Sequence, residues 1–156
     1  MLGQAVPHTE ADVGNRFLGY LMDVLGDGGD QLALLEQRID EFGHRLKRAR
    51  VSKGIAAYLV EAVLIPSVLY PLGVATFLPA QIRRLESRAL RWVLPKVGLC
   101  RSFARNLVGA GRDIGGLGWT RWTVRVALMK SQLAMELAEH PEPGVRGVWA
   151  SMRQRA

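Results

Sequence analysis

The sequence predicts a mainly α protein, an irregular bundle of about five helices with a short N-terminal strand or hairpin remnant. Apolar residues recur at intervals of three and four along several segments, which is the period of one helix face. Prolines and glycines lie mainly between these segments, where they begin or end helices. With 156 residues, 49% of them hydrophobic and 22% charged, the chain is expected to fold as one domain.

The N-terminal region carries weaker signals. Residues 1–14 are expected to form a flexible leader. Residues 15–22, NRFLGYLM, are short and apolar, and they run into the turn formers GDGGD at 26–30. We expect a strand or hairpin remnant followed by a loop.

An amphipathic helix is expected over residues 31–50. One narrow stripe of this helix holds Leu32, Leu35, Ile39, Phe42 and Leu46. Ser52 is suited to be the N-cap of a second helix. That helix is expected to carry Ile55, Leu59 and Val63 and to be disturbed at Pro66, which has no amide hydrogen.

Residues 62–80, AVLIPSVLYPLGVATFLPA, contain no charged side chain. This length is sufficient for a transmembrane helix, but prolines at 66, 71 and 79 interrupt it. Two interpretations stay open. The stretch is a buried, kinked core helix followed by a loop, or it meets lipid or a partner protein.

A further helix is expected from Pro79 to Pro95, because proline is well tolerated in a first helical turn and stops a helix later. Its apolar face holds Ile82, Leu85, Ala89, Trp92 and Val93. Arg84, Arg88 and Arg91 fall within a narrow arc opposite that face. Core contacts are therefore expected on one side of this helix and free cations on the other.

The last third of the chain is expected to begin with a basic, glycine-containing connection that includes one short helix. A helix from about residue 120 to 140 follows, with a stripe of Trp122, Val126, Met129 and Leu133. Residues 15–140 are expected to form the helical domain. Residues 141–156 are expected to add a short helix, from Gly144 to Arg155, or a tail.

The charge is distributed unevenly. The formal net charge is +7, and 17 of the 21 basic residues are arginine. Residues 1–80 hold 7 bases and 9 acids, whereas residues 81–156 hold 14 bases and 5 acids. Because a guanidinium matches phosphate oxygens with a planar fork of donors, this bias favours a polyanionic partner.

The positive charge is concentrated between Arg83 and Arg112, where eight cations face a single acid, Glu86. We predict a nucleic-acid-binding surface formed by Arg84, Arg88, Arg91, Lys96, Arg101 and Arg105. A second basic group supports it and comprises Arg45, Lys47, Arg48, Arg50 and Lys53. The open alternative is an arginine-rich face that is merely solvated.

The stretch RDIGGLGW, residues 112–119, is not a phosphate loop. A G-x-G-x-x-G fingerprint would need glycine at Ile114 or at Arg121, and no G-K-[ST] sequence is present. We expect a structural turn. Its glycines, Gly115, Gly116 and Gly118, are expected to serve positive φ angles or close helix packing.

Metal and cofactor chemistry finds no support in the sequence. The three histidines are far apart, and Cys100 is the only cysteine, so neither a zinc set nor an internal disulfide is expected. No metal and no cofactor are predicted. The N-terminus lacks the pattern of a secretory signal, so we expect an intracellular protein, in cytoplasm or nucleus.

The order of these segments resembles the region after the palm in reverse transcriptases of non-LTR-type retroelements. The resemblance covers about residues 15–137 and rests on LIPSVLYP, QIRRLESRALRWVLPKVGLCR and GRDIGGLG. The positions that fit the family pattern are Pro66, Tyr70, Pro71, Gln81, Leu85, Glu86, Leu90, Arg91, Leu94, Pro95, Lys96, Gly98, Arg101, Arg105, Gly111, Gly115, Gly116, Leu117 and Gly118.

This resemblance implies a helical thumb and connection region that grips the template and primer backbone. The family's catalytic carboxylates form an aromatic-x-Asp-Asp motif in the palm, whereas this chain has no adjacent Asp-Asp pair. Without them no metal pair can be held for phosphoryl transfer. We therefore expect a nucleic-acid-binding fragment that is not an enzyme on its own, with a separate palm domain as an implied partner. The alternative is a membrane-associated or helical interaction module that uses residues 62–80.

Overall fold

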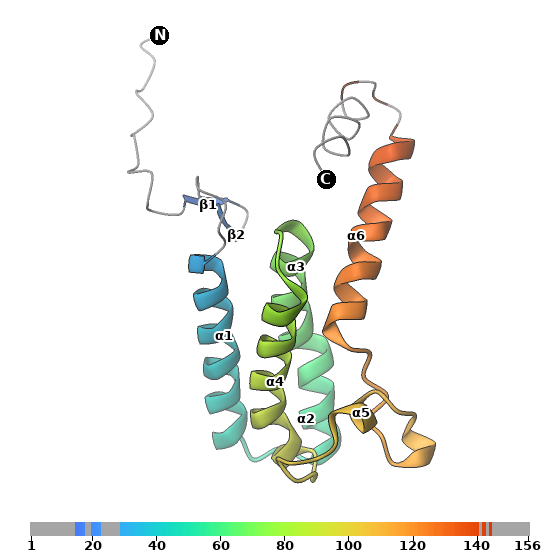
Figure 1. Ribbon diagram of the computed structural model, residues 1–156. Coiled ribbons are helices and arrows are strands. Elements are labelled where there is room, and N and C mark those ends of the chain that lie inside the picture. Colours follow the sequence, from blue (N-terminus) through green and yellow to red (C-terminus); the bar gives the residue numbers. More distant parts are fainter. Residues whose placement is uncertain (1–14, 18–19, 23–28, 141, 143, 145–156) are drawn as a thin grey trace.

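The protein is mainly helical, as the sequence predicts (Figure 1). The computed structural model describes residues 15–17, 20–22, 29–140, 142 and 144. The expected leader and, apart from Gly144, the expected C-terminal helix lie outside these residues. The elements are β1 (Asn15–Phe17), β2 (Tyr20–Met22), α1 (Gly29–Arg48), α2 (Lys53–Leu59), the π-helical segment η1 (Val60–Leu64), α3 (Ile65–Val74), α4 (Pro79–Lys96), α5 (Arg105–Val108), the 3₁₀ turn η2 (Arg112–Ile114) and α6 (Trp122–Glu139).

The long helices form an up-and-down arrangement in which α1 and α4 lie side by side and run in the same direction (Figure 1). The continuous segment α2–η1–α3, which lies between α1 and α4 in the sequence, runs in the opposite direction to both (Figure 1). Helix α6 packs against α3 and α4. The strands β1 and β2 form an antiparallel pair ahead of α1, with Phe17 opposite Tyr20. This pair lies where the sequence predicts a strand or hairpin remnant.

The core lies between α1, α4 and α3, and the expected stripes of α1 and α4 supply most of it. Leu35, Ile39 and Leu85 are fully buried. Trp92 is half-buried and lies across α1 at Gly43, where an added Cβ would overlap the indole ring. Glycine at this point of α1 therefore lets the two helices accommodate a large aromatic side chain between them.

The segment α2–η1–α3 differs from its prediction in two ways. The helix does not end at Pro66 but continues to Val74, and the five π-helical residues Val60–Leu64 end two positions before this proline. A wider turn of this kind accommodates a residue that cannot donate to the carbonyl four positions earlier. The uncharged stretch 62–80 is consequently not one helix, because residues 75–78 separate α3 from α4.

The buried face of this segment is also displaced from the expected one. Ala56, Val60 and Leu64 are buried, whereas Ile55 and Val63 are about half exposed. Since nearly every position here is apolar, periodicity cannot identify which face meets the core. The same correction applies to Leu133 of α6, which is exposed, although Trp122 and Val126 of its predicted stripe are buried.

The helix ends follow local sequence signals. The Ser52 Oγ accepts a hydrogen bond from the Ile55 N–H at 3.3 Å, so Ser52 is the N-cap of α2 as predicted. At the end of α4, Gly98 has a φ of 86° and Leu99 N–H donates to the Leu94 carbonyl at 2.9 Å. This Schellman-type end, with glycine in the left-handed region, stops the helix just beyond Pro95.

The predicted roles of the turn glycines are confirmed. Gly115 and Gly118 have φ values of 82° and 68°, which L side chains rarely adopt. Gly116 serves close packing instead, because an added Cβ would overlap the backbone of Ala110. RDIGGLGW therefore begins with η2 and turns the chain toward α6.

Replacing Gly43 by alanine is expected to destabilise the fold by about 1–3 kcal/mol, because the methyl group would displace the Trp92 ring from a packed contact. The matched control is Gly54→Ala in α2, where an added Cβ meets open space. That control is expected to be neutral or to stabilise the protein by up to about 1 kcal/mol. Urea unfolding followed by circular dichroism measures both; equal stability of the two variants would contradict the packing role of Gly43.

Candidate nucleic-acid interface

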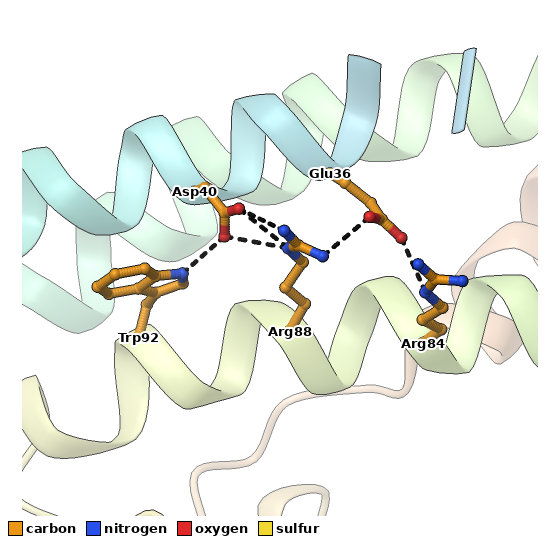
Figure 2. Close-up of polar contacts among 5 residues, drawn as sticks. All are labelled: Glu36, Asp40, Arg84, Arg88 and Trp92. Atoms are coloured by element: carbon orange, nitrogen blue, oxygen red, sulfur yellow. Dashed lines mark hydrogen bonds and ion pairs between the residues drawn. The ribbon is translucent and has the colours of Figure 1, made fainter. Parts of the chain in front are cut away.

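An ion-pair network joins α1 and α4 (Figure 2). The Arg88 guanidinium donates from Nε to Asp40 Oδ1 at 3.0 Å and from Nη2 to Asp40 Oδ2 at 2.6 Å. Its third nitrogen, Nη1, donates to Glu36 Oε2 at 2.8 Å. Glu36 Oε1 also forms an ion pair with Arg84 Nε at 2.8 Å, and Asp40 accepts a hydrogen bond from Trp92 Nε1 at 2.9 Å. One arginine of α4 thus binds two carboxylates that are one turn apart on α1.

The ionisation of Asp40 reflects this environment. The hydrogen bonds from Arg88 lower the pKa of the Asp40 carboxyl, and partial burial opposes this effect. The hydrogen bond from Trp92 and the Coulombic interactions with Arg88 and His44 lower the pKa further. The pKa of Arg88 is raised, first of all by its hydrogen bond to Asp40. Both groups are therefore charged at neutral pH, and the charge of Arg88 is balanced inside the protein.

The six cations that the sequence assigns to one surface are consequently divided among different surroundings. Arg88 is half-buried against α1, and Arg84, although its side chain is 66% exposed, pairs with Glu36. The expectation that these two arginines project freely from the side of α4 opposite the core is wrong. The carboxylates of Glu36 and Asp40 were missed in the sequence. Their four-residue spacing, which matches that of Arg84 and Arg88, is the signal that points to them.

Arg91, Lys96 and Arg101 lie elsewhere, toward the C-terminal end of α4. Because α1 and α4 run in the same direction, the second basic group meets them at this end (Figure 1). Lys96 Nζ donates to the Ala49 carbonyl at 3.0 Å. The Lys53 side chain passes over Gly98, where an added Cβ would be 2.6 Å from Nζ. Two segments about fifty residues apart therefore form one surface.

We call this surface the basic end. It comprises Arg45, Lys47, Arg48, Arg50, Lys53, Arg91, Lys96 and Arg101. No acidic residue occurs within 44–53 or within 89–101. The C-termini of α1 and α4 contribute only about half a negative charge each, so most of the positive charge remains uncompensated.

A cavity of about 390 Å³ opens beside the basic end and is lined by Asp40, Arg88, Arg91, Trp92 and Arg101. Asp40 and Arg88 already bond to each other. Arg91 and Arg101 are exposed and form no hydrogen bond or ion pair with the described residues. These two guanidinium groups are available to an anionic partner, next to the indole of Trp92.

Arg105 lies apart from the basic end. It lines a different cavity, together with Arg83 and Arg121, between α4, α5 and the start of α6. Within residues 29–140, no three histidine, cysteine, aspartate or glutamate side chains are grouped so that they could hold a metal ion.

One helical stretch among the described residues, Lys53–Val74, is long and apolar enough to cross a membrane by length and composition. The stretch has 22 residues; an 18-residue window within it has a mean hydropathy of 1.8, and 44% of this window is buried inside the protein. The core helix of a soluble protein has the same properties.

No family model matches the chain, and searches of curated proteins and of solved structures find no match. The resemblance to retroelement reverse transcriptases therefore stays a prediction from the residues.

Replacing Arg88 by methionine is expected to destabilise the protein by about 1–3 kcal/mol, because Asp40 and Glu36 lose a shared charged donor. Arg84→Met is the matched control, since the Arg84 side chain is 66% exposed and Glu36 keeps its bond to Arg88, so a cost of less than about 1 kcal/mol is expected. Chemical denaturation measures both. If the two variants lost equal stability, the fork of Arg88 would not be the main link between α1 and α4.

The lowered pKa of Asp40 also predicts a pH dependence. In the unfolded chain this carboxyl titrates near 3.9, above its folded pKa, so its stabilising effect is complete above about pH 5 and is lost as the pH falls below about 4. Asp40→Asn lacks this contribution. The difference in unfolding free energy between the wild type and Asp40→Asn is therefore expected to shrink on acidification. A constant difference from pH 6 to pH 3 would exclude the effect.

Proposed function

We propose that this chain binds the sugar-phosphate backbone of nucleic acid through the basic end and is not catalytic on its own. One observation carries the proposal. Two basic segments, distant in the sequence, meet where α1 and α4 end, while nearby carboxylates of α1 are neutralised by Arg84 and Arg88. The internal pairs thus neutralise Glu36 and Asp40, whereas Glu41 of α1 stays exposed and accepts a hydrogen bond from Gln37.

The chemistry of the basic end suits phosphate. Each lysine or arginine that neutralises a phosphate releases condensed counterions and so adds affinity without reading the sequence. The two free guanidinium groups at the cavity, Arg91 and Arg101, can each bond two phosphate oxygens. Trp92 beside them offers part of an indole face, although its N–H is occupied by Asp40.

The resemblance to the post-palm region of retroelement reverse transcriptases supports the same proposal. Three of the proposed contacts, Arg91, Lys96 and Arg101, occupy positions that fit the family pattern. The turn glycines that fit it adopt the conformations or close contacts that only glycine permits. The missing Asp-Asp pair is the reason why we propose no synthesis by this chain alone, and a separate palm polypeptide is the partner that the resemblance implies.

The salt dependence of duplex binding tests the proposal. With a duplex that carries 5′-hydroxyl ends, the logarithm of the binding constant is expected to fall linearly with the logarithm of salt concentration. The double variant Arg48→Gln/Arg101→Gln should reduce the slope by about 2, because each lost phosphate contact contributes about 0.9. Fluorescence anisotropy from about 50 to 200 mM salt measures this slope.

The matched control is Arg38→Gln/Arg83→Gln, which removes the same charge from outside the basic end. It is expected to leave the slope nearly unchanged. Absent binding, binding that does not respond to salt, or an equal effect of the two double variants would contradict the basic end as the binding surface.

A second candidate, membrane association, is favoured by the apolar stretch Lys53–Val74. Val63, Tyr70 and Val74 present exposed apolar surface on one part of this helix, and basic residues precede it. Such a helix could meet lipid with the basic end at an anionic surface. Retention of the chain in vesicle pellets after a carbonate wash would favour this candidate, and complete release would exclude a membrane span.

A further inference from the structure

The cavity beside α5 gathers three arginines that have little internal compensation. It measures about 200 Å³ and is lined by Arg83, Glu86, Ser87, Leu90, Arg105, Val108 and Arg121. These residues come from α4, from α5 and from the residue just before α6. The cavity therefore forms only when three segments of the chain pack together.

Arg105 is the unusual member of this group. Its Nη1 is buried and has no hydrogen-bond partner among the described residues. A buried guanidinium N–H without an acceptor costs free energy, so an acceptor supplied from outside the chain would relieve a defect of the free protein. This unpaired donor distinguishes the cavity from an ordinary arginine-rich surface.

The charged residues that line the cavity, Arg105 included, give an excess of two positive charges. Arg83 is exposed and forms no ion pair or hydrogen bond with the described residues. Arg121 uses Nη2 to bind Asn106 Oδ1 at 3.1 Å, which fixes its guanidinium without neutralising it. The one acid, Glu86, accepts a hydrogen bond from the Trp122 N–H at the start of α6, at 3.2 Å. Three cations thus oppose one carboxylate that already has a donor.

We propose that this cavity binds a phosphomonoester dianion. Such a group carries about 1.5 to 2 negative charges at neutral pH and three acceptor oxygens, which matches the excess charge and the three guanidinium groups. A backbone phosphodiester carries a single negative charge, so it matches the excess of two positive charges less well. Ser87 supplies an additional neutral donor at the wall.

The source of the group is the 5′-phosphate end of a nucleic-acid strand, a step that rests on the proposed function. The cavity and the basic end use separate arginines, so a strand held along the basic end and a strand terminus held in the cavity are independent contacts. Free phosphate shares the same chemistry and is the other source.

Titration of the ¹⁵N-labelled protein with inorganic phosphate, against sodium chloride at equal ionic strength, tests the cavity itself. Arginine Nε–H resonances should shift saturably, those of Arg105 and Arg121 most. Arg83→Met should weaken phosphate binding about tenfold, as expected for the loss of one charge-assisted donor. Arg38→Met, which removes the same charge from outside both cavities and the basic end, should leave it unchanged. Because Arg83 is exposed, its variant tests the site even if Arg105→Met fails to fold.

Oligonucleotides with a 5′-phosphate or a 5′-hydroxyl distinguish the two sources. Tighter binding of the phosphorylated strand, abolished by Arg83→Met but kept in Arg38→Met, supports a nucleic-acid terminus. Saturable phosphate binding without that preference assigns the cavity to free phosphate and overturns the nucleic-acid source only. No saturable shift with phosphate, or equal weakening by both variants, overturns the site. Neither result depends on the salt slope of 5′-hydroxyl duplexes, so failure here is separable from failure of the proposed function.

Discussion

The hydrogen-bond fork of Arg88 is the interaction on which the arrangement of the helices depends. It binds Asp40 and Glu36, which lie one turn apart on α1, and so fixes both the distance and the axial register of α1 against α4. Trp92, one turn after Arg88, supports the same register of the two helices through its hydrogen bond to Asp40 and its contact with Gly43. Apolar packing alone would tolerate a slip of one turn, whereas two carboxylates matched to one guanidinium do not.

This register has a consequence for charge. Since α1 and α4 are parallel, both C-termini point to the same end, and cations placed there are favoured by two helix dipoles. Lys96 illustrates this effect, because it bonds the Ala49 carbonyl beyond the end of α1. The stabilisation available from two helix ends is nevertheless too small to account for eight cations. The remaining positive charges repel one another in the free protein, and a bound polyanion would reduce this repulsion.

The sequence was sufficient to predict the helices whose two faces differ in polarity. The stripes of α1 and α4, the Ser52 cap and the turn of Gly115, Gly116 and Gly118 are local features, and the structure has them. It was insufficient for α2–η1–α3, where apolar residues surround the helix and no period marks the buried face. It was also insufficient for Arg88. The spacing of residues within one helix shows which side chains share a face, but not whether the neighbouring helix presents carboxylates to that face.

The arginines of α4 and α5 differ in function because they differ in the acids they meet. Arg88 meets two carboxylates and becomes structural; Arg91 meets none and stays free at the basic end; Arg105 has one buried nitrogen, Nη1, without an acceptor among the described residues. All three are arginines in the same basic part of the sequence, so composition cannot separate them. The free energy of a guanidinium depends on the acceptors that packing brings to it. A basic sequence therefore becomes a binding surface only where the nearby carboxylates are paired with other residues. In this chain, Glu36 and Asp40 of α1 pair with Arg84 and Arg88.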